Sequence, residues 1–193
     1  MTSPAQQKKK LRTRILKKRD ALKPIVRAAR SVVICESLIG RRAYQKAKTV
    51  AIFVTYRSEV NTLPIIQDLL HKGKVVAVPR ISGKGKMEFY QLNDPDKDLV
   101  PGTYGIREPK KWSKMVKAQD IDLMVAPGSV LDDRGYRIGY GGGFFDRYIP
   151  RLKKGCPVIS LGFEMQMVKM VPNESFDKKV DMVITEKRVI RTK

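Results

Sequence analysis

A cluster of glycines lies in the second half of the chain, flanked by charged residues. Four of the five residues from Gly139 to Gly143 are glycine, Arg137 precedes them, and Asp146 and Arg147 follow. Glycine has no Cβ, so successive backbone N–H groups can converge on an anion. Arginine suits phosphate oxygens, and aspartate suits Mg²⁺. The pattern predicts a cradle for a nucleotide and its metal ion; the alternative is a tight structural turn.

Two familiar phosphate-binding motifs are excluded at this position. No Lys-Ser or Lys-Thr pair follows the glycines, as a Walker A loop requires, and Phe144 stands where a dinucleotide-binding fingerprint needs its last glycine. A helix is expected to begin near Gly142 and to run to Leu152. Its positive N-terminal end would add to the same anion site.

The elements that hold this loop alternate along the chain. Short apolar runs predict buried strands at 49–54, 74–78, 121–126, 158–163 and 180–185, helical patterns cover 25–39 and 62–70, and the segment 93–112, rich in Pro, Gly and charge, is expected to be irregular. The alternation predicts an α/β fold: a single three-layer α/β/α domain over residues 1–193, with a mostly parallel central sheet covered on both faces. Ligands of such sheets bind at the carboxyl ends of the strands, and the glycine cluster follows the strand at 121–126.

The charge of the chain is strongly positive and uneven. Its 193 residues hold 40 Lys and Arg against 19 Asp and Glu, a formal net charge of +21, and eleven of these cations lie in residues 1–30 beside one acid, Asp20. Apolar residues at Leu11, Ile15, Leu16 and Leu22 predict a basic amphipathic helix over residues 1–23 that packs on the domain. Its cationic face suits a polyphosphate ligand, nucleic acid or plain solvent, and charge alone does not choose among them.

Composition excludes several classes of protein. A hydrophobic content of 42% argues against a disordered chain. No run of about 18 apolar residues is present to span a membrane, and no apolar segment follows the basic N-terminus as a secretory signal requires. With two cysteines, Cys35 and Cys156, a cytoplasmic location is expected. These cysteines and the single histidine, His71, cannot form a metal cluster, so catalysis must use carboxylates, Lys, Arg and hard metal ions.

Several segments together resemble one enzyme family. The stretch after Arg137 reads R-x-G-x-G-x-G-[aromatic]-[aromatic]-D-R, and P-G-x-x-x-D precedes it. Further matching segments are Lys8 to Arg12, Phe53 to Glu59, Val78-Pro79-Arg80, Gly105 to Pro109 and Val180 to Val183. In this order, over nearly the whole chain, they resemble the 5-formyltetrahydrofolate cyclo-ligase (5,10-methenyltetrahydrofolate synthetase) family.

The resemblance implies an ATP- and Mg²⁺-dependent ring closure. ATP would phosphorylate the formyl oxygen of 5-formyltetrahydrofolate, the N10 nitrogen would attack the activated carbon, and phosphate would leave. The products would be 5,10-methenyltetrahydrofolate, ADP and phosphate. Phosphoryl transfer depends mainly on positioning and charge neutralisation, so a site without histidine is suited to it.

The resemblance also implies roles for residues at matching positions. Arg137 and Asp146 would be catalytic, and Asp146 and Asp181 would hold Mg²⁺. Val54, Glu59 and Phe145 would contact the folate, with Glu59 accepting from the donor edge of the pterin. The residues expected to bind ATP are Lys8, Arg12, Arg137, Gly139, Tyr140, Gly141, Gly142, Gly143, Phe144 and Phe145. In the lysine run, Lys9 or Lys10 could take the place of Lys8.

The chain departs from the family pattern at two points. Phe144-Phe145 replaces a pair that is often tyrosine, and Gly142 stands where the family often has lysine. A non-catalytic member that binds folate or nucleotide is therefore one alternative reading, and a basic nucleic-acid-binding protein is another. The expected partners are ATP and the folate, whose polyglutamate form would suit the excess of lysine. We expect a monomer, with no membrane and no specific nucleic-acid partner.

Overall fold

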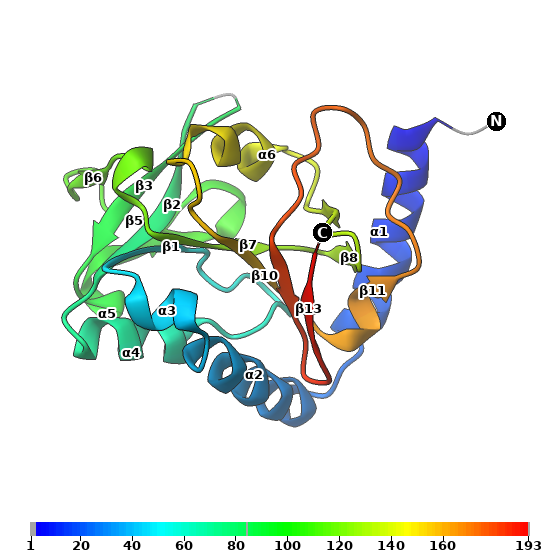
Figure 1. The fold of residues 1–193 in the computed structure, drawn as a ribbon, viewed down its shortest axis with the longest axis horizontal. Helices are drawn as coiled ribbons and strands as arrows, with labels where there is room; N and C mark the ends of the chain where they lie inside the picture. Colours follow the sequence, from blue (N-terminus) through cyan, green and yellow to red (C-terminus); the bar gives the residue numbers. More distant parts are fainter. Residues whose placement is uncertain (1–2, 84, 193) are drawn as a thin grey trace.

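The computed structural model describes residues 3–83 and 85–192, and a large sheet runs through its centre (Figure 1). From one edge to the other, its strands are β13 (Val189–Arg191), β12 (Met182–Ile184), β10 (Val158–Leu161), β7 (Leu123–Pro127), β1 (Thr49–Ile52), β2 (Val75–Gly83), β3 (Lys86–Leu92) and β6 (Met115–Val116). The strands from β12 to β2 pair in parallel, and β13, β3 and β6 add antiparallel edges. The predicted α/β fold with a mostly parallel sheet is confirmed.

The two faces of this sheet are covered unequally. Helices α2 (Pro24–Ile39), α3 (Arg42–Lys46) and α4 (Leu63–His71) lie along the lower face in Figure 1. Side chains alternate across β1. Val50 and Ile52 therefore join the core between the sheet and these helices, and Ala51 joins the core on the other face of the sheet. That second face carries the short helix α6 (Phe144–Tyr148), whose Tyr148 ring packs 4.8 Å from Phe89.

The helix expected from Gly142 to Leu152 is shorter than predicted. It begins at Phe144, and after five α-helical residues the chain continues only as a 3-10 helix, Ile149–Arg151. The second helical layer is therefore thin. Further 3-10 turns lie at Ala118–Asp120 and Glu164–Gln166.

Residues 93–112 are more ordered than the sequence predicts. They form the helix α5 (Pro95–Asp98), the paired antiparallel strands β4 (Leu99–Pro101) and β5 (Arg107–Pro109), and the 3-10 turn Thr103–Gly105. Leu99 and Glu108 are buried. The prediction of an irregular segment was wrong, because strands of three residues that end in proline are too short for an alternating pattern to be seen.

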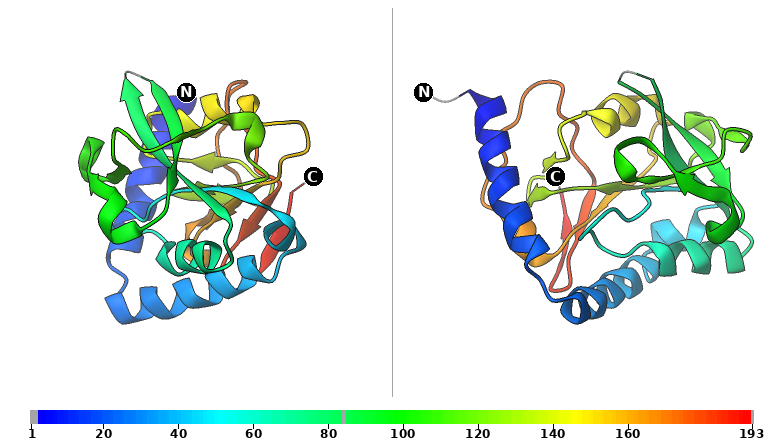
Figure 2. Two further views of the ribbon diagram at one scale, coloured as in Figure 1. Left: turned by 90° about the vertical axis from the view of Figure 1, so that its left-hand side faces the viewer. Right: turned by 180° about the vertical axis from the view of Figure 1, so that it is seen from behind.

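The basic N-terminal helix is present as α1 (Pro4–Asp20) and lies at one end of the main sheet (Figure 2). Ser3 and Gln6 cap its start by reciprocal hydrogen bonds. Its apolar side meets a second, small sheet of β11 (Met167–Val168), β8 (Val130–Asp132) and β9 (Arg137–Ile138). Ile15 forms one buried cluster with Val130 and Ile138 of this sheet. Within the described ranges, no helix has the length and apolar content that a membrane span requires.

We expect Ile15→Ala to lower the free energy of unfolding by about 2–4 kcal/mol, because Ile15 is 4% exposed and its truncation leaves a cavity against Val130 and Ile138. Ile25→Ala is the control, since Ile25 is 75% exposed and its loss should change stability by no more than about 0.5 kcal/mol. Urea unfolding measures both. Equal effects of the two substitutions would contradict the packing of α1 on the small sheet.

Candidate active site

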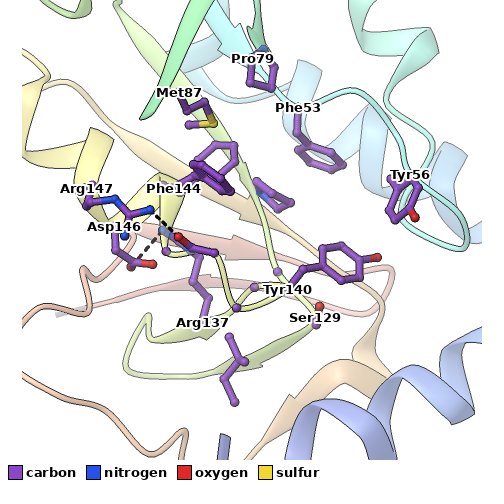
Figure 3. A pocket seen from close by; sticks show the side chains of 18 of the residues that line it. Phe53, Tyr56, Pro79, Met87, Ser129, Arg137, Tyr140, Phe144, Asp146 and Arg147 are labelled. Carbon is purple, nitrogen blue, oxygen red and sulfur yellow. Dashed lines mark hydrogen bonds and ion pairs between the residues drawn. The ribbon is translucent and has the colours of Figure 1, made fainter. Parts of the chain in front are cut away.

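A cavity of about 1180 Å³ opens at the carboxyl ends of β1, β2 and β7, as expected for a parallel sheet (Figure 3). Its walls come from α1, the loop 53–59, the β2–β3 arm, the turn 104–108, the segment 127–129, the segment 137–147 and the segment 174–178. This volume lies above the range of about 300–1,000 Å³ that is common for single small-ligand sites.

The glycine loop, Gly139–Gly143, forms one wall of the cavity between β9 and α6. Gly141 and Gly143 have φ angles of 106° and 61°, which side-chain-bearing residues rarely adopt. A Cβ at Gly143 would lie 2.8 Å from Nη1 of Arg147, and one at Gly141 would lie 3.3 Å from Nη1 of Arg12. The loop thus requires glycine at these two positions for its backbone angles, whereas the arginine ends beside them are flexible and can shift. With five residues, α6 is too short to supply the helix dipole that the sequence predicted.

Arg137 and Asp146 form an ion pair inside the cavity. Nη2 of Arg137 lies 3.2 Å from Oδ1 of Asp146, and the same oxygen accepts a hydrogen bond from the backbone N–H of Lys178 at 3.1 Å. Burial lowers the pKa of Arg137, while the charges of Asp146 and Asp177 oppose this shift. Nε of Arg137 is buried and has no partner among the described residues. The carboxylate of Asp146, whose side chain is 15% exposed, keeps lone pairs for a ligand.

Two cations of α1 also reach the cavity. Nζ of Lys8 lies 2.9 Å from Glu174 and 2.5 Å from Asp177, and Nη1 of Arg12 donates to the carbonyl of Gly139 at 3.4 Å. Burial alone would lower the pKa of Lys8, but its hydrogen bonds to Asp177 and Glu174 raise it. Lys9 and Lys10 are exposed and do not line the cavity, so Lys8 is the member of the lysine run that lies at the site.

The structure does not bring Asp181 to the site, contrary to the expectation that it lies beside Asp146. Asp181 precedes β12, at the amino end of the parallel strands, and its carboxylate accepts from the backbone N–H of Val158 at 2.7 Å. The second aspartate in the cavity is Asp177, which the sequence analysis missed. Asp177 lies in an irregular loop that contains no recognisable motif. The only signal in the sequence is a pair of acidic residues, Glu174 and Asp177, next to two lysines.

The predicted folate-binding residues Val54 and Glu59 also line the cavity, in the loop after β1. Glu59 is 7% exposed, and its carboxylate accepts from the backbone N–H of Tyr56 at 2.9 Å. Burial raises the pKa of Glu59 to about 7, although the Tyr56 N–H, the charge of Arg19 and the Tyr140 hydroxyl act against it. Glu59 therefore titrates near neutral pH.

The aromatic pair after the glycine loop also lines the cavity, but its rings have partners. The guanidinium of Arg137 lies 5.6 Å from the ring centre of Phe145, and that of Arg147 lies 5.5 Å from Phe144. Tyr140 packs edge-on against Tyr56 with ring centres 5.6 Å apart. Cavity-lining residues to which the sequence analysis gave no role include Tyr56, Arg57, Tyr104, Glu108, Phe176 and Asp177.

A mostly parallel α/β sheet whose carboxyl edge carries a large cavity, a glycine loop and an Arg–Asp pair is typical of enzymes that act on anionic substrates. Residues 4–186 match the model of the 5-formyltetrahydrofolate cyclo-ligase family, and the chain belongs to this family.

Individual relatives match over most of their length. The 5-formyltetrahydrofolate cyclo-ligase of Mus musculus is 29% identical over 189 residues, 93% of either chain, and that of Escherichia coli is 31% identical over 148 residues, 74% of this chain and 80% of the relative. The solved structure of Aquifex aeolicus 5,10-methenyltetrahydrofolate synthetase superposes with a TM-score of 0.84 at 30% identity, covering 95% of this chain and 92% of that one.

We expect Glu59 to make stability depend on pH. Its pKa is raised from 4.5 to about 7 by folding, so its stabilising contribution is complete below pH 4.5 and is lost as the pH rises through about 7. The loss relative to Glu59→Gln should reach about 3 kcal/mol, and urea unfolding of both proteins at about pH 4.5 and about pH 8 measures it. A difference in stability that stays constant with pH would contradict the raised pKa.

Proposed function

We propose that this chain catalyses the ATP-dependent cyclisation of 5-formyltetrahydrofolate to 5,10-methenyltetrahydrofolate, with release of ADP and phosphate. Membership of the cyclo-ligase family supports the reaction. The observation that carries the proposal is the Arg137–Asp146 pair beside the glycine loop, in one cavity with Lys8 and Glu59. This arrangement puts groups suited to phosphate and a carboxylate suited to the pterin in the same cavity.

The proposed reaction proceeds in two balanced steps. The formyl oxygen attacks the γ-phosphorus of ATP, the bond to ADP breaks, and a phosphorylated formyl group forms on N5. The N10 nitrogen then attacks the formyl carbon, loses its proton, and the C–O bond breaks with release of phosphate. Phosphate is a far better leaving group than hydroxide, so this chain's residues need chiefly to bind and orient the reactants.

The cations of the site are assigned to the triphosphate. Lys8, Arg12 and Arg137 would bind its oxygens by charge-assisted hydrogen bonds, together with the N–H groups of the glycine loop. Val54, Glu59 and Phe145 would hold the folate on the other side, with Phe145 at the junction of the two substrates. Stacking on phenylalanine does not need the hydroxyl that tyrosine would supply.

The carboxylates of the cavity fit a magnesium ion. Asp146 and Asp177 supply hard oxygen ligands, and Mg²⁺ in phosphoryl-transfer sites is commonly held by one or two carboxylates plus substrate phosphates. When bound, the ion would neutralise charge on the transferring phosphoryl group. We propose Asp146 and Asp177 as its ligands; Asp181 lies outside the cavity, where its carboxylate accepts from the backbone of Val158.

We further propose that the protein acts as a monomer in the cytoplasm. Both cysteines are free thiols in the structure, which suits a reducing compartment. Light scattering of the purified protein and fractionation of its native cells test the two statements.

The direct test of the proposed function supplies 5-formyltetrahydrofolate, ATP and Mg²⁺ and follows the near-ultraviolet absorption of the methenyl product. Asp146→Asn is expected to lower kcat by at least about 100-fold, because the carboxylate beside Arg137 is lost. Asp133→Asn is the control, since its side chain is 59% exposed and pairs on the surface with Arg188. Folate and ATP binding without product would instead identify a non-catalytic member; turnover by Asp146→Asn equal to wild type would remove Asp146 from the mechanism.

The metal assignment is tested by a matched pair of substitutions. Asp177→Asn should raise the Mg²⁺ concentration for half-maximal activity by about tenfold or more, whereas Asp181→Asn should leave it unchanged. Both variants lose one carboxylate within the same segment, and only Asp177 lines the cavity. The reverse result would restore Asp181 and exclude Asp177.

A further inference from the structure

Arg19 lies in the last turn of α1 and is buried, with 1% of its surface exposed, whereas its neighbours Lys17 and Lys18 face solvent. It does not line the cavity. Burying a guanidinium is costly unless its N–H groups are hydrogen-bonded. The hydrogen-bond partners of Arg19 therefore show which segments the end of α1 connects.

The guanidinium of Arg19 joins three segments that are far apart in the sequence. Nε donates to the hydroxyl of Ser58 at 2.9 Å, and Nη2 donates to the hydroxyl of Tyr140 at 2.8 Å. Ser58 in turn donates to the carboxylate of Asp20. Because the guanidinium is planar and rigid, these bonds fix the end of α1, the loop after β1 and the glycine loop relative to one another.

The same contacts surround Glu59. Ser58 is its chain neighbour, Tyr56 donates its backbone N–H to it, and Tyr140 packs on the ring of Tyr56. The charged and titratable groups that act on Glu59 are Arg19 from α1 and Tyr140 from the glycine loop; both oppose the rise of its pKa that burial causes. Arg19 thus touches both sides of the cavity without entering it.

We propose that Arg19 is a positioning residue for the cyclo-ligase reaction: through Tyr140 and Ser58 it sets the glycine loop and the folate-binding Glu59 in one fixed arrangement. The proposal rests on the proposed function of the cavity. In this role, loss of the guanidinium impairs both substrate sites together and changes the charge state of Glu59. A purely structural arginine would lower stability without these effects.

The first experiment needs no substrate and therefore does not depend on turnover. The pKa of Glu59 is measured by NMR of its side-chain carboxyl carbon in ligand-free wild type, Arg19→Met and Arg14→Met. Arg14→Met is the matched control, because it removes the same charge from an exposed position of the same helix. We expect the pKa of Glu59 to rise in Arg19→Met and to stay at its wild-type value in Arg14→Met.

The second experiment measures steady-state kinetics over pH for the same proteins. Arg19→Met should raise KM for both 5-formyltetrahydrofolate and ATP by about tenfold, and the pH dependence of the folate KM should move to higher pH. Tyr140→Phe removes the hydroxyl that accepts from Arg19 and that also bonds Glu59, so on its own it should raise KM for both substrates, and its effect in the Arg19→Met background should be smaller than in the wild type. Arg19→Lys keeps the charge but loses the fork, so it should hold the pKa of Glu59 near wild type while KM still rises.

These outcomes separate the proposal from its premises. If Arg19→Met and Arg14→Met give the same Glu59 pKa and the same KM values, Arg19 is not a positioning residue, whatever the stability of the variant. If Arg19→Met does not fold, the test uses Arg19→Lys and Tyr140→Phe instead. KM values that are unchanged in both of these variants would overturn the proposal. If the wild type folds but forms no product, the proposed function fails, and the NMR result still judges the coupling of Arg19 to Glu59.

Discussion

The arrangement of the site depends on keeping a buried cation paired. Arg137, in β9 of the small sheet, is 5% exposed, and an unpaired charge there would cost several kcal/mol. Asp146 must therefore come back to it, although it stands only nine positions later in the chain. The glycine loop makes that return possible by turning through backbone angles that other residues avoid. The geometry suited to phosphate follows from this local electrostatic requirement.

The N-terminal helix supplies what the sheet cannot. Strands β7 and β1 place the segments that follow them on one edge, but neither provides enough cations for a triphosphate. α1 packs its apolar side on the small sheet that contains β9, so Lys8 and Arg12 reach the cavity from outside the sheet. Some cations of the basic N-terminal helix thus face solvent, and others, Lys8 and Arg12, line the cavity. A count of charges in the sequence does not distinguish the two groups.

The strands and the glycine loop could be predicted because each has a local signal: a short apolar run, or a cluster of one residue type. Asp181 was misplaced, although a residue just before a parallel strand must lie at the amino end of the sheet, away from the ligand edge. Asp177 and Arg19 carried no such signal. Asp177 lies in an irregular loop, and Arg19 lies among exposed lysines of a helix, so only the tertiary packing distinguishes them.

The ion pairs of Lys8 with Glu174 and Asp177 neutralise the positive charge of Lys8 within the cavity. On the proposed function, a triphosphate that enters competes with these carboxylates for the same ammonium group. Once Lys8 turns to the phosphates, Asp177 loses its partner and its charge becomes available to a divalent cation. Arrival of the nucleotide and arrival of the metal are then mutually reinforcing, because each removes the electrostatic cost that the other would face alone.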